Sequence, residues 1–456
     1  MISHGASPRP RAGTCAAGRQ AGRPAGSGRH RHSGDQRSPY RAVFAVREFD
    51  GLWSAQVLSS AGDQFAQIAV AVGAYERTGS PFLCALVYAM SYLPQIIGGP
   101  LLAEVAGLFS RRSLMIGLSL SRAAIVALMA SSGMSFAALC ALLVLTMMLG
   151  ASFSRARSAL LPDVLPASQL ASGAELSSIS SHAGQLLGFL AGGAVVAVLG
   201  PRGTLMAGAV AFLVAAGIAR ALISWRPAPR RRAAGRPLAL PVTRHEAAAV
   251  IGQPVPRTLL LLCWLSGCAV VPEALAAPYA RVLHGGPLTA GLLLAALPAG
   301  AVTGAAAVAF LTRPSERPQV MSWLAVLSCA PLIGSSLHPP LWVVLTLWVL
   351  AGAGSSYQLA AVAAFVRAMP AADRPGAVEF AQAGLLAAQG AGLLVAGLAA
   401  QLIGPQAAIA MTGFFGLAAA MTLARTWCRL HSQLHPPRLG PLAPGAASRS
   451  GGTGSG

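Results

Sequence analysis

The segment Leu93–Arg112, LPQIIGGPLLAEVAGLFSRR, decides how the rest of the chain is interpreted. It is an apolar run with one proline and a Gly-Gly-Pro step, which a helix tolerates most easily inside a packed membrane bundle. The run ends in FSRR at 109–112, and a second apolar run, SLMIGLSLSRAAIVALMA, follows at once. Two membrane-spanning helices joined by a tight, doubly basic turn are the simplest physical interpretation.

The composition points to the same class of protein. Charged residues make up 10% of the 456 residues and hydrophobic residues 55%, whereas soluble domains carry about 25% charged residues. The net charge of +20 would suggest nucleic acid as a partner of a soluble protein. Here every basic residue is Arg, and the arginines lie between apolar runs and in the tails, so we interpret them as topology signals and expect no nucleic-acid partner. The seven scattered cysteines form no CxxC motif, so they predict apolar packing rather than a metal site, and no cofactor is expected.

The apolar runs predict twelve spans, each of about 20 residues or more. They are placed at 52–74, 81–103, 114–133, 135–155, 170–199, 203–223, 258–283, 287–311, 319–337, 340–363, 376–402 and 405–427.

The spans fall into two groups of six, which sets the expected domains. Residues 47–223 form an N-terminal six-helix bundle and residues 258–430 a C-terminal one. The basic segment 224–257 is the expected cytoplasmic linker. Residues 1–46 and 431–456 are polar and short of large apolar side chains, so disordered tails are expected there.

The arginines predict the orientation. The odd-numbered connections carry only Arg77, Arg202 and Arg281, while the other arginines between spans lie in the even-numbered connections and the central linker. Basic loops stay in the cytoplasm. The odd-numbered connections are therefore expected outside, and both termini in the cytoplasm, in a multi-pass protein of the cell (plasma) membrane.

An internal repeat supports the division into two bundles. A constant shift of 204 positions aligns polar and turn residues of the two halves. The matched positions include Tyr75 with Tyr279, Glu175 with Glu379, Gln185 with Gln389, and Gly200-Pro201 with Gly404-Pro405. Duplicated halves that bind substrate near the membrane midplane are typical of secondary transporters.

The opening segment also resembles the signature loop of the major facilitator superfamily, whose pattern is roughly G-x-x-x-D-R-x-x-R-R. Arg111 and Arg112 match the Arg pair, whereas Gly107 and Leu108 stand where the acid and the first Arg belong. The resemblance continues upstream in Gly62-Asp63, Tyr75, TGSP at 78–81 and Leu93-Pro94. The macrolide-efflux and siderophore-exporter branch is the most similar. The resemblance implies an all-α, 6+6 helix bundle with pseudo-two-fold symmetry.

Asp63 is the first candidate functional residue. An ionisable group in a span costs about 2.5–3.5 kcal/mol on insertion scales and is by default a functional candidate. Asp63 lies about 15 Å into the first span, on a polar stripe with Ser60, Gln64 and Gln67. We expect Asp63 to couple transport to protons, and Gln64 and Gln67 to bind substrate. The alternative is that the stripe only hydrogen-bonds neighbouring spans.

Further candidates lie in other spans. Glu273 follows Pro272, and a carboxylate beside a helix bend predicts a cavity wall and a substrate contact. Arg122 is the expected charge partner of a carboxylate, or else it snorkels to the interface. The other residues that could line a pocket for an amphipathic ligand, with a core role equally open, are Tyr88, Tyr92, Tyr357 and Gln358.

A second set of residues predicts gating at the cytoplasmic side. These residues are Gly98, Gly99, Glu104, Arg111, Arg112, Glu175 and Glu379. Because Gly107 replaces the acid of the family pattern, Arg111 and Arg112 need another partner. We consider Glu104 within the same half, or Glu379 across the halves as a cytoplasmic lock.

These features together predict a secondary active transporter and not an enzyme. It would export a small amphipathic molecule, such as a drug, antibiotic or siderophore-like compound, by proton antiport with alternating access, as a monomer in the bilayer. The alternatives are an uptake or ion-independent facilitator, a non-transporting membrane sensor or partner, and a lipid-modifying membrane enzyme. The last should show clustered acidic or His/Asp motifs, and the 13 acidic residues are dispersed.

The Arg distribution makes a topological prediction. A reporter inserted in the connection 200–203 should report the outer side, and one inserted in 224–257 the cytoplasm, because only the second is rich in arginine. Cysteine labelling of intact cells checks this. Labelling both connections from the same side would contradict the twelve-span topology.

Overall fold

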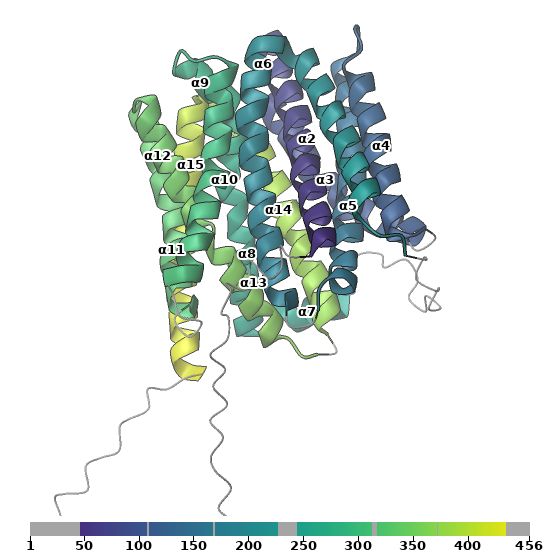
Figure 1. The fold of residues 1–456 in the computed structure, drawn as a ribbon. Coiled ribbons are helices and arrows are strands. Elements are labelled where there is room, and N and C mark those ends of the chain that lie inside the picture. The colour runs from purple at the N-terminus through teal and green to yellow at the C-terminus, as the bar shows by residue number, and fades with distance from the viewer. Residues whose placement is uncertain are drawn as a thin grey trace, which may run out of the picture.

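The computed structural model describes residues 46–106, 109–166, 169–226, 244–311, 317–371 and 373–434. Within these ranges, the side chains at 93–94, 97–106, 170–172, 174–175, 178, 244–246, 249, 309–310, 317–319 and 431–434 are not described. The described chain is helical between short connections and contains no β-strand (Figure 1).

Each half of the chain supplies six spans. Those of the N-terminal half are α2 (Arg47–Thr78), α3 (Pro81–Ala106), α4 (Arg111–Met129), α5 (Phe136–Val164) and α6 (Leu170–Leu222), which holds two spans. Those of the C-terminal half are α8 (Pro254–Ala269) with α9 (Val271–Val282), α10 (Pro287–Leu311), α11 (Arg317–Ile333) with η2 (Gly334–Leu337), α12 (Leu341–Gly354) with α13 (Tyr357–Ala368), α14 (Arg374–Ile403) and α15 (Pro405–Leu434). A short helix, α7 (Arg244–Ile251), lies within the segment 224–257 that was expected to be only a polar linker.

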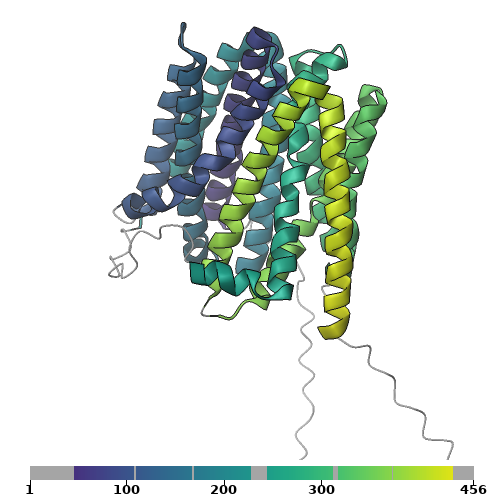
Figure 2. The ribbon, with the colours of Figure 1, turned by 180° about the vertical axis from the view of Figure 1, so that it is seen from behind.

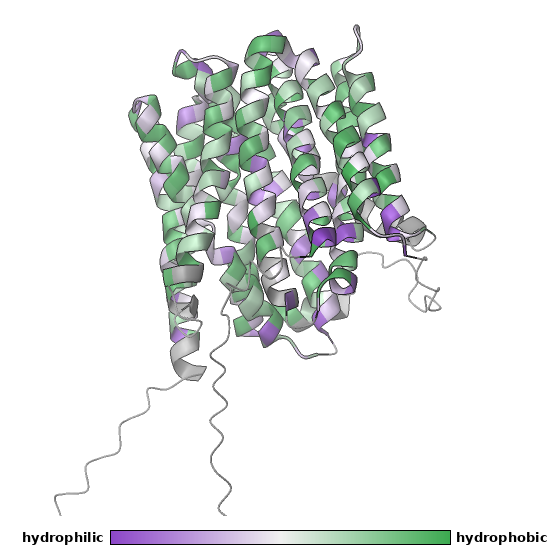
Figure 3. Cartoon of the chain, viewed as in Figure 1, coloured by the Kyte–Doolittle hydropathy of each residue, from purple (hydrophilic) through white to green (hydrophobic). Residues whose placement is uncertain are grey.

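Nine helical runs in the described residues are long and apolar enough to cross a membrane. One of them, Ile179–Leu222, contains two spans because the helix breaks at Gly200. The helices α2 and α3 complete the set of twelve. The first is long enough but is interrupted by polar residues such as Ser60, Asp63, Gln64 and Gln67, and only Pro81–Tyr92 of the second qualifies as an apolar run. Hydrophobic residues dominate the helices along most of their length (Figure 3).

The two arginines of the predicted basic turn open the next helix. Helix α3 ends at Ala106 and α4 begins at Arg111. Ser110 is the N-cap of α4, and its hydroxyl accepts a hydrogen bond from the Ser113 backbone N–H at 3.2 Å. A serine at this position satisfies one of the backbone donors that a helix start leaves free.

The repeat is visible in the backbone of the turns. Positive φ angles occur in the described chain at six residues, one in each odd-numbered connection: Gly79, Gly133, Gly200, His284, His338 and Gly404. They form three pairs, 204 or 205 positions apart, that relate the two halves. Left-handed backbone is rare for residues other than glycine, so its recurrence at matching turns supports the duplicated architecture independently of side-chain similarity.

The two halves meet along two helix pairs. Helix α6 lies against α10, and α3 against α14; Figure 1 shows the first pair and Figure 2 the second. Helix α2 begins and α15 ends at the lower end of Figure 1, whereas the turn at Gly200 lies at the upper end. We call the upper end outer, following the orientation that the arginines predict.

Glycines allow the closest approach between the halves. A Cβ atom built on Gly291 would lie 2.6 Å from the Cα of Gly193, and one on Gly397 would lie 2.3 Å from the Cβ of Ala85. Both contacts lie in the outer parts of their helices, and Gly193 is seven residues before the turn at Gly200. The molecule is therefore closed at its outer end.

At the inner end, the start of α2 is tied to the end of α6. The Glu48 carboxylate accepts hydrogen bonds from the Ser224 N–H and the Arg226 guanidinium, both at 2.8 Å. Burial alone would raise the pKa of Glu48, but these hydrogen bonds outweigh it and hold the pKa below its ordinary value. The central linker thus leaves the N-terminal half from a fixed point.

The glycine contact yields a prediction. Gly193→Leu should prevent outer closure, because its side chain would overlap the α10 backbone at Gly291. Overpacking costs about 1–3 kcal/mol, which corresponds to an increase of about fivefold or more in outer accessibility. A membrane-impermeant thiol reagent reacting with a Val72→Cys reporter measures it. Gly117→Leu, where an added Cβ meets nothing within 4 Å, is the control. Equal labelling of the two variants would contradict the assignment.

Candidate functional site

Asp63 and Arg122 form an ion pair between α2 and α4 in the middle of the N-terminal half. The Arg122 side chain is fully buried, whereas the Asp63 side chain retains 22% exposure. A second Arg122 nitrogen donates to the Ser59 hydroxyl at 2.7 Å. Arg122 is therefore the partner of Asp63 in this conformation. Of the two alternatives that the sequence left open, it pairs with a carboxylate rather than snorkelling to the interface.

The surroundings explain why glycines recur beside this pair. The Arg122 guanidinium lies 4.1 Å above the ring centroid of Phe212, a favourable position for a cation over an aromatic face. A Cβ on Gly62 would lie 2.8 Å from the Phe212 ring, and one on Gly150 would lie 3.1 Å from the guanidinium. The Gly62-Asp63 step thus serves packing and charge at once.

The other members of the polar stripe are buried inside the N-terminal half. Gln67 donates to the Met147 sulfur at 3.6 Å, and Gln56 donates to the Ser60 hydroxyl at 3.1 Å. The Gln64 amide oxygen is buried and has no hydrogen-bond partner among the described residues. Of these two contacts, only the Gln67–Met147 contact reaches a neighbouring span, because Gln56 and Ser60 lie on the same helix. Substrate binding by Gln64 and Gln67 stays a prediction.

Glu273 lies where the two halves meet. It is in the first turn of α9, directly after the break at Val270 that separates α9 from α8. The hydroxyl of Tyr92, on α3 of the other half, hydrogen-bonds to the Glu273 carboxylate. Tyr92 and Glu273 were each predicted to bind substrate, and the fold brings them together. Nothing in their sequence spacing required this contact.

Tyr357 does not belong to such a site. Its side chain is fully buried in the core of the C-terminal half, and its hydroxyl donates to the Leu262 carbonyl at 2.9 Å. A ligand could not reach this ring without unpacking the core, so the expectation of substrate binding by Tyr357 is corrected to a structural role. Gln358 is half-buried on the next position of α13, and its role stays a prediction.

The expected cytoplasmic lock is not formed in this conformation. Arg111 pairs with Asp163 at 2.7 Å and Arg112 donates to the Arg220 carbonyl at 2.5 Å, both within the N-terminal half. Glu379 is exposed and makes no ion pair with the described residues. Sequence reasoning missed Asp163 because it lies 52 positions from Arg111 on another helix. The packing around Gly98 and Gly99 and the side chains of Glu104 and Glu175 are not described, so the gating roles of these four residues stay predictions.

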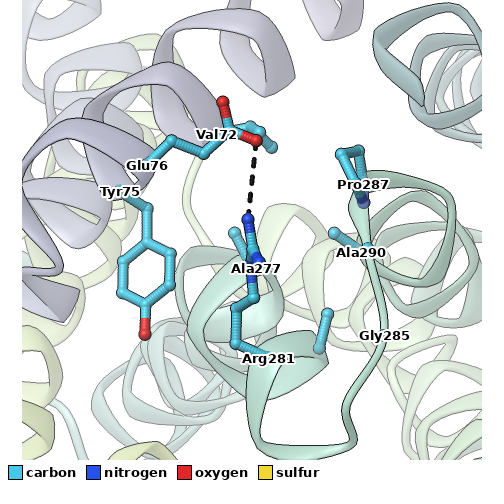
Figure 4. A pocket seen from close by; sticks show the side chains of 10 residues that line it. Val72, Tyr75, Glu76, Ala277, Arg281, Gly285, Pro287 and Ala290 are labelled. Carbon is cyan, nitrogen blue, oxygen red and sulfur yellow. Dashed lines mark ion pairs between the residues drawn. The ribbon is translucent and has the colours of Figure 1, made fainter. Parts of the chain in front are cut away.

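An ion pair between the halves closes the outer end instead. Glu76 of α2 lies 3.6 Å from Arg281 of α9 in a shallow pocket between α2, α9 and α10 (Figure 4). Close by, the Ser80 hydroxyl donates to the Gln401 amide oxygen at 2.9 Å. Arg281 is one of three arginines in the odd-numbered connections, and a rare outer arginine near an outer acid was the sequence signal that could have predicted this contact.

The comparison with known families agrees with this geometry. Residues 52–314, more than half of the chain, match the Major Facilitator Superfamily. The chain belongs to the major facilitator superfamily. No curated protein sequence matches this facilitator at a significant level, and the efflux and siderophore-exporter branch stays a resemblance.

Solved transporters share the fold of this facilitator at low sequence identity. A bacterial homologue of the human lysosomal transporter Spinster, inward-facing and unoccupied, has a TM-score of 0.63 and 16% identity over 87% of this chain and 99% of its own. The nucleoside transporter NupG gives 0.64 and 11%, over 83% and 99%. A peptide transporter, POT, in complex with sulfate gives 0.65 and 14%, over 87% and 98%. Family and fold indicate a membrane transporter rather than an enzyme.

Metal chemistry has no evident site in the part of the facilitator that the structure describes. No group of three or more His, Cys, Asp or Glu side chains is placed to hold a metal ion there. The functional candidates within the described spans are the carboxylates of Asp63 and Glu273 and their neighbours.

The Asp63–Arg122 pair makes a prediction for this facilitator. Arg122→Gln should destabilise the protein by about 3–5 kcal/mol, because it leaves the Asp63 carboxylate in the middle of a span without its cation. The double variant Asp63→Asn/Arg122→Gln should regain most of this loss. Thermal unfolding in detergent measures both effects. Arg202→Gln, at an exposed outer position, is the control. If the double variant were less stable than Arg122→Gln, the pair would not be the source of the loss.

Proposed function

We propose that this chain is a secondary active transporter that exports a small amphipathic molecule by proton antiport with alternating access. The observation that carries the proposal is Asp63, an acid near the middle of α2 that is held by Arg122 while the outer end is closed. Counting residues along the helix places it about 23 Å from either end of α2.

The ion pair fits one half of an antiport cycle. In the outer-closed state, Arg122 favours the deprotonated form of Asp63, as expected after proton release toward the cytoplasm. When the halves rock to open outward, a separation of α2 and α4 would weaken the pair and let Asp63 take a proton. Protonation would then accompany release of the substrate outside. Proton loss to the cytoplasm would reset the site.

The substrate class is suggested by the chemistry between the halves. Tyr92 and Glu273 offer an aromatic face, a hydroxyl and a carboxylate in an otherwise apolar bundle. Such a mixture suits a small molecule with an apolar body and a polar group. Export rests on the resemblance of the first two spans to drug-efflux facilitators, and we propose the cell membrane and a monomer as its setting.

An ion-independent facilitator is the second candidate. It is favoured by the same ion pair, because an arginine that never leaves Asp63 would keep the carboxylate charged throughout the cycle. The two candidates differ in what a proton gradient does. Only the antiporter concentrates substrate against its own gradient.

Asp63→Asn tests the proposal. The amide mimics the protonated carboxyl in shape but cannot exchange a proton, so uphill export should fall to the background of cells without the transporter. Downhill exchange should persist in part. Accumulation of macrolides and fluorescent amphipathic dyes in a transporter-deficient host, with and without a protonophore, measures both.

The control for this experiment is Asp373→Asn, which alters an acid at the inner end, before α14. It should export at the wild-type rate. If Asp63→Asn exported against the gradient as fast as wild type, Asp63 would be structural. The antiport mechanism proposed through it would then be wrong.

A further inference from the structure

The two membrane-buried carboxylates differ in their counter-charges. Asp63 has Arg122, whereas Glu273 makes no ion pair with the described residues. The arginine on its own helix, Arg281, lies eight positions further along, about 12 Å away by helix rise, and is already paired with Glu76. Glu273 is therefore an acid whose balancing cation is not supplied by the described side chains around it.

Burial between the halves opposes a charge on Glu273, whereas the helix start and the hydroxyl of Tyr92 stabilise the charged form, so a bound cation would favour the carboxylate. Glu273 lies in the first turn of α9, at the end of the helix dipole that favours negative charge. The Tyr92 hydroxyl donates to it, whereas Tyr88, one turn earlier on α3, is buried in the core. A discontinuous helix with a functional group at the break is a recurring design of transporter binding sites.

The position also touches both halves. Glu273 comes from the C-terminal half, and Tyr88 and Tyr92 come from the N-terminal half. On the outer side of Glu273, the Glu76–Arg281 and Ser80–Gln401 contacts join the two halves. Tyr92 and Glu273 are only half-buried, whereas Tyr88 is 3% exposed. A molecule bound beside Glu273 would therefore contact each half just below the outer seal, by which we mean the Glu76–Arg281 and Ser80–Gln401 contacts.

We infer that Glu273 and Tyr92 form the binding site for the positively charged group of an organic cation. The inference deepens the proposed function, on which it rests, by naming the substrate class as amphipathic monocations. The bound cation supplies the counter-charge that Glu273 lacks, and the Tyr92 ring supplies an aromatic group that attracts a cation. A neutral or anionic molecule of the same shape would leave Glu273 uncompensated.

A matched pair of probe ions tests the site without requiring transport. Tetraphenylphosphonium and tetraphenylborate have nearly the same size and shape but opposite charge. Purified wild-type protein in nanodiscs should bind tetraphenylphosphonium at least about tenfold more tightly than tetraphenylborate, as charge complementarity at a buried site predicts. Glu273→Gln, which keeps a hydrogen-bond acceptor for Tyr92, should weaken tetraphenylphosphonium binding by about tenfold or more.

Two further variants separate the site from its surroundings. Tyr92→Phe keeps the ring and removes the hydroxyl, so it should retain most of the affinity, whereas Tyr92→Leu should lose more of it. Asp373→Asn should bind as wild type does. Thermal unfolding of each variant verifies that it is folded. Equal binding of tetraphenylphosphonium by wild type and folded Glu273→Gln would overturn the inference, as would a wild type that binds neither ion or prefers the anion.

The outcome is independent of the proposed transport cycle. Selective binding of tetraphenylphosphonium that depends on Glu273, without proton-driven export of any compound, would support the cation site and overturn the proposed function. Proton-driven export of neutral or anionic compounds, without selective tetraphenylphosphonium binding, would overturn the cation site and leave the proposed function standing.

Discussion

A hydrocarbon environment offers no water to a buried charge, and the architecture of the N-terminal half depends on this constraint. Arg122 is fully buried, so it must find its partners inside the half that contains it. It does so through Asp63, Ser59 and the face of Phe212, which draw together α2, α4 and the second span of α6. These contacts tie three of the six spans of the N-terminal half to one another.

The two halves solve the same packing problem with different chemistry. The shift of 204 positions that relates them places Gly267 opposite Asp63 and Val326 opposite Arg122. In the C-terminal half neither position carries a charge, and Gly267 packs closely on α14, where an added Cβ would lie 3.0 Å from the Ala388 carbonyl oxygen. Conversely, Glu273 corresponds to Ala69, which is buried and apolar. Charge that differs between otherwise duplicated halves is more readily explained by function than by the fold.

The sequence predicted the fold to the level of spans because hydrophobic length and arginine placement are local properties. The turn at Ser110-Arg111 and the repeat of Gly200 and Gly404 appear in the structure as expected. The partners of individual side chains were harder to predict, because they depend on how helices rotate against one another. Arg111 forms its ion pair with Asp163 rather than with Glu379, and the Tyr357 side chain packs inside its own half. Asp63 and Arg122 were predictable as partners only because buried charges of opposite sign are so few.

The outer seal has a bearing on how a ligand could drive the cycle. The Glu76–Arg281 pair is 3.6 Å long, with side chains that are 37% and 55% exposed, and exposed pairs of this kind contribute about 0–1 kcal/mol. The glycine contacts fix the geometry of closure but cannot change with substrate or proton. Reversing a two-state preference from 1:99 to 99:1 requires about 5.5 kcal/mol of differential binding. The outer ion pair is too weak to supply this, so the larger share must come from groups whose charge or occupancy changes during the cycle. Among the described side chains that join the halves, Glu273 with Tyr92 is the contact that best meets that requirement.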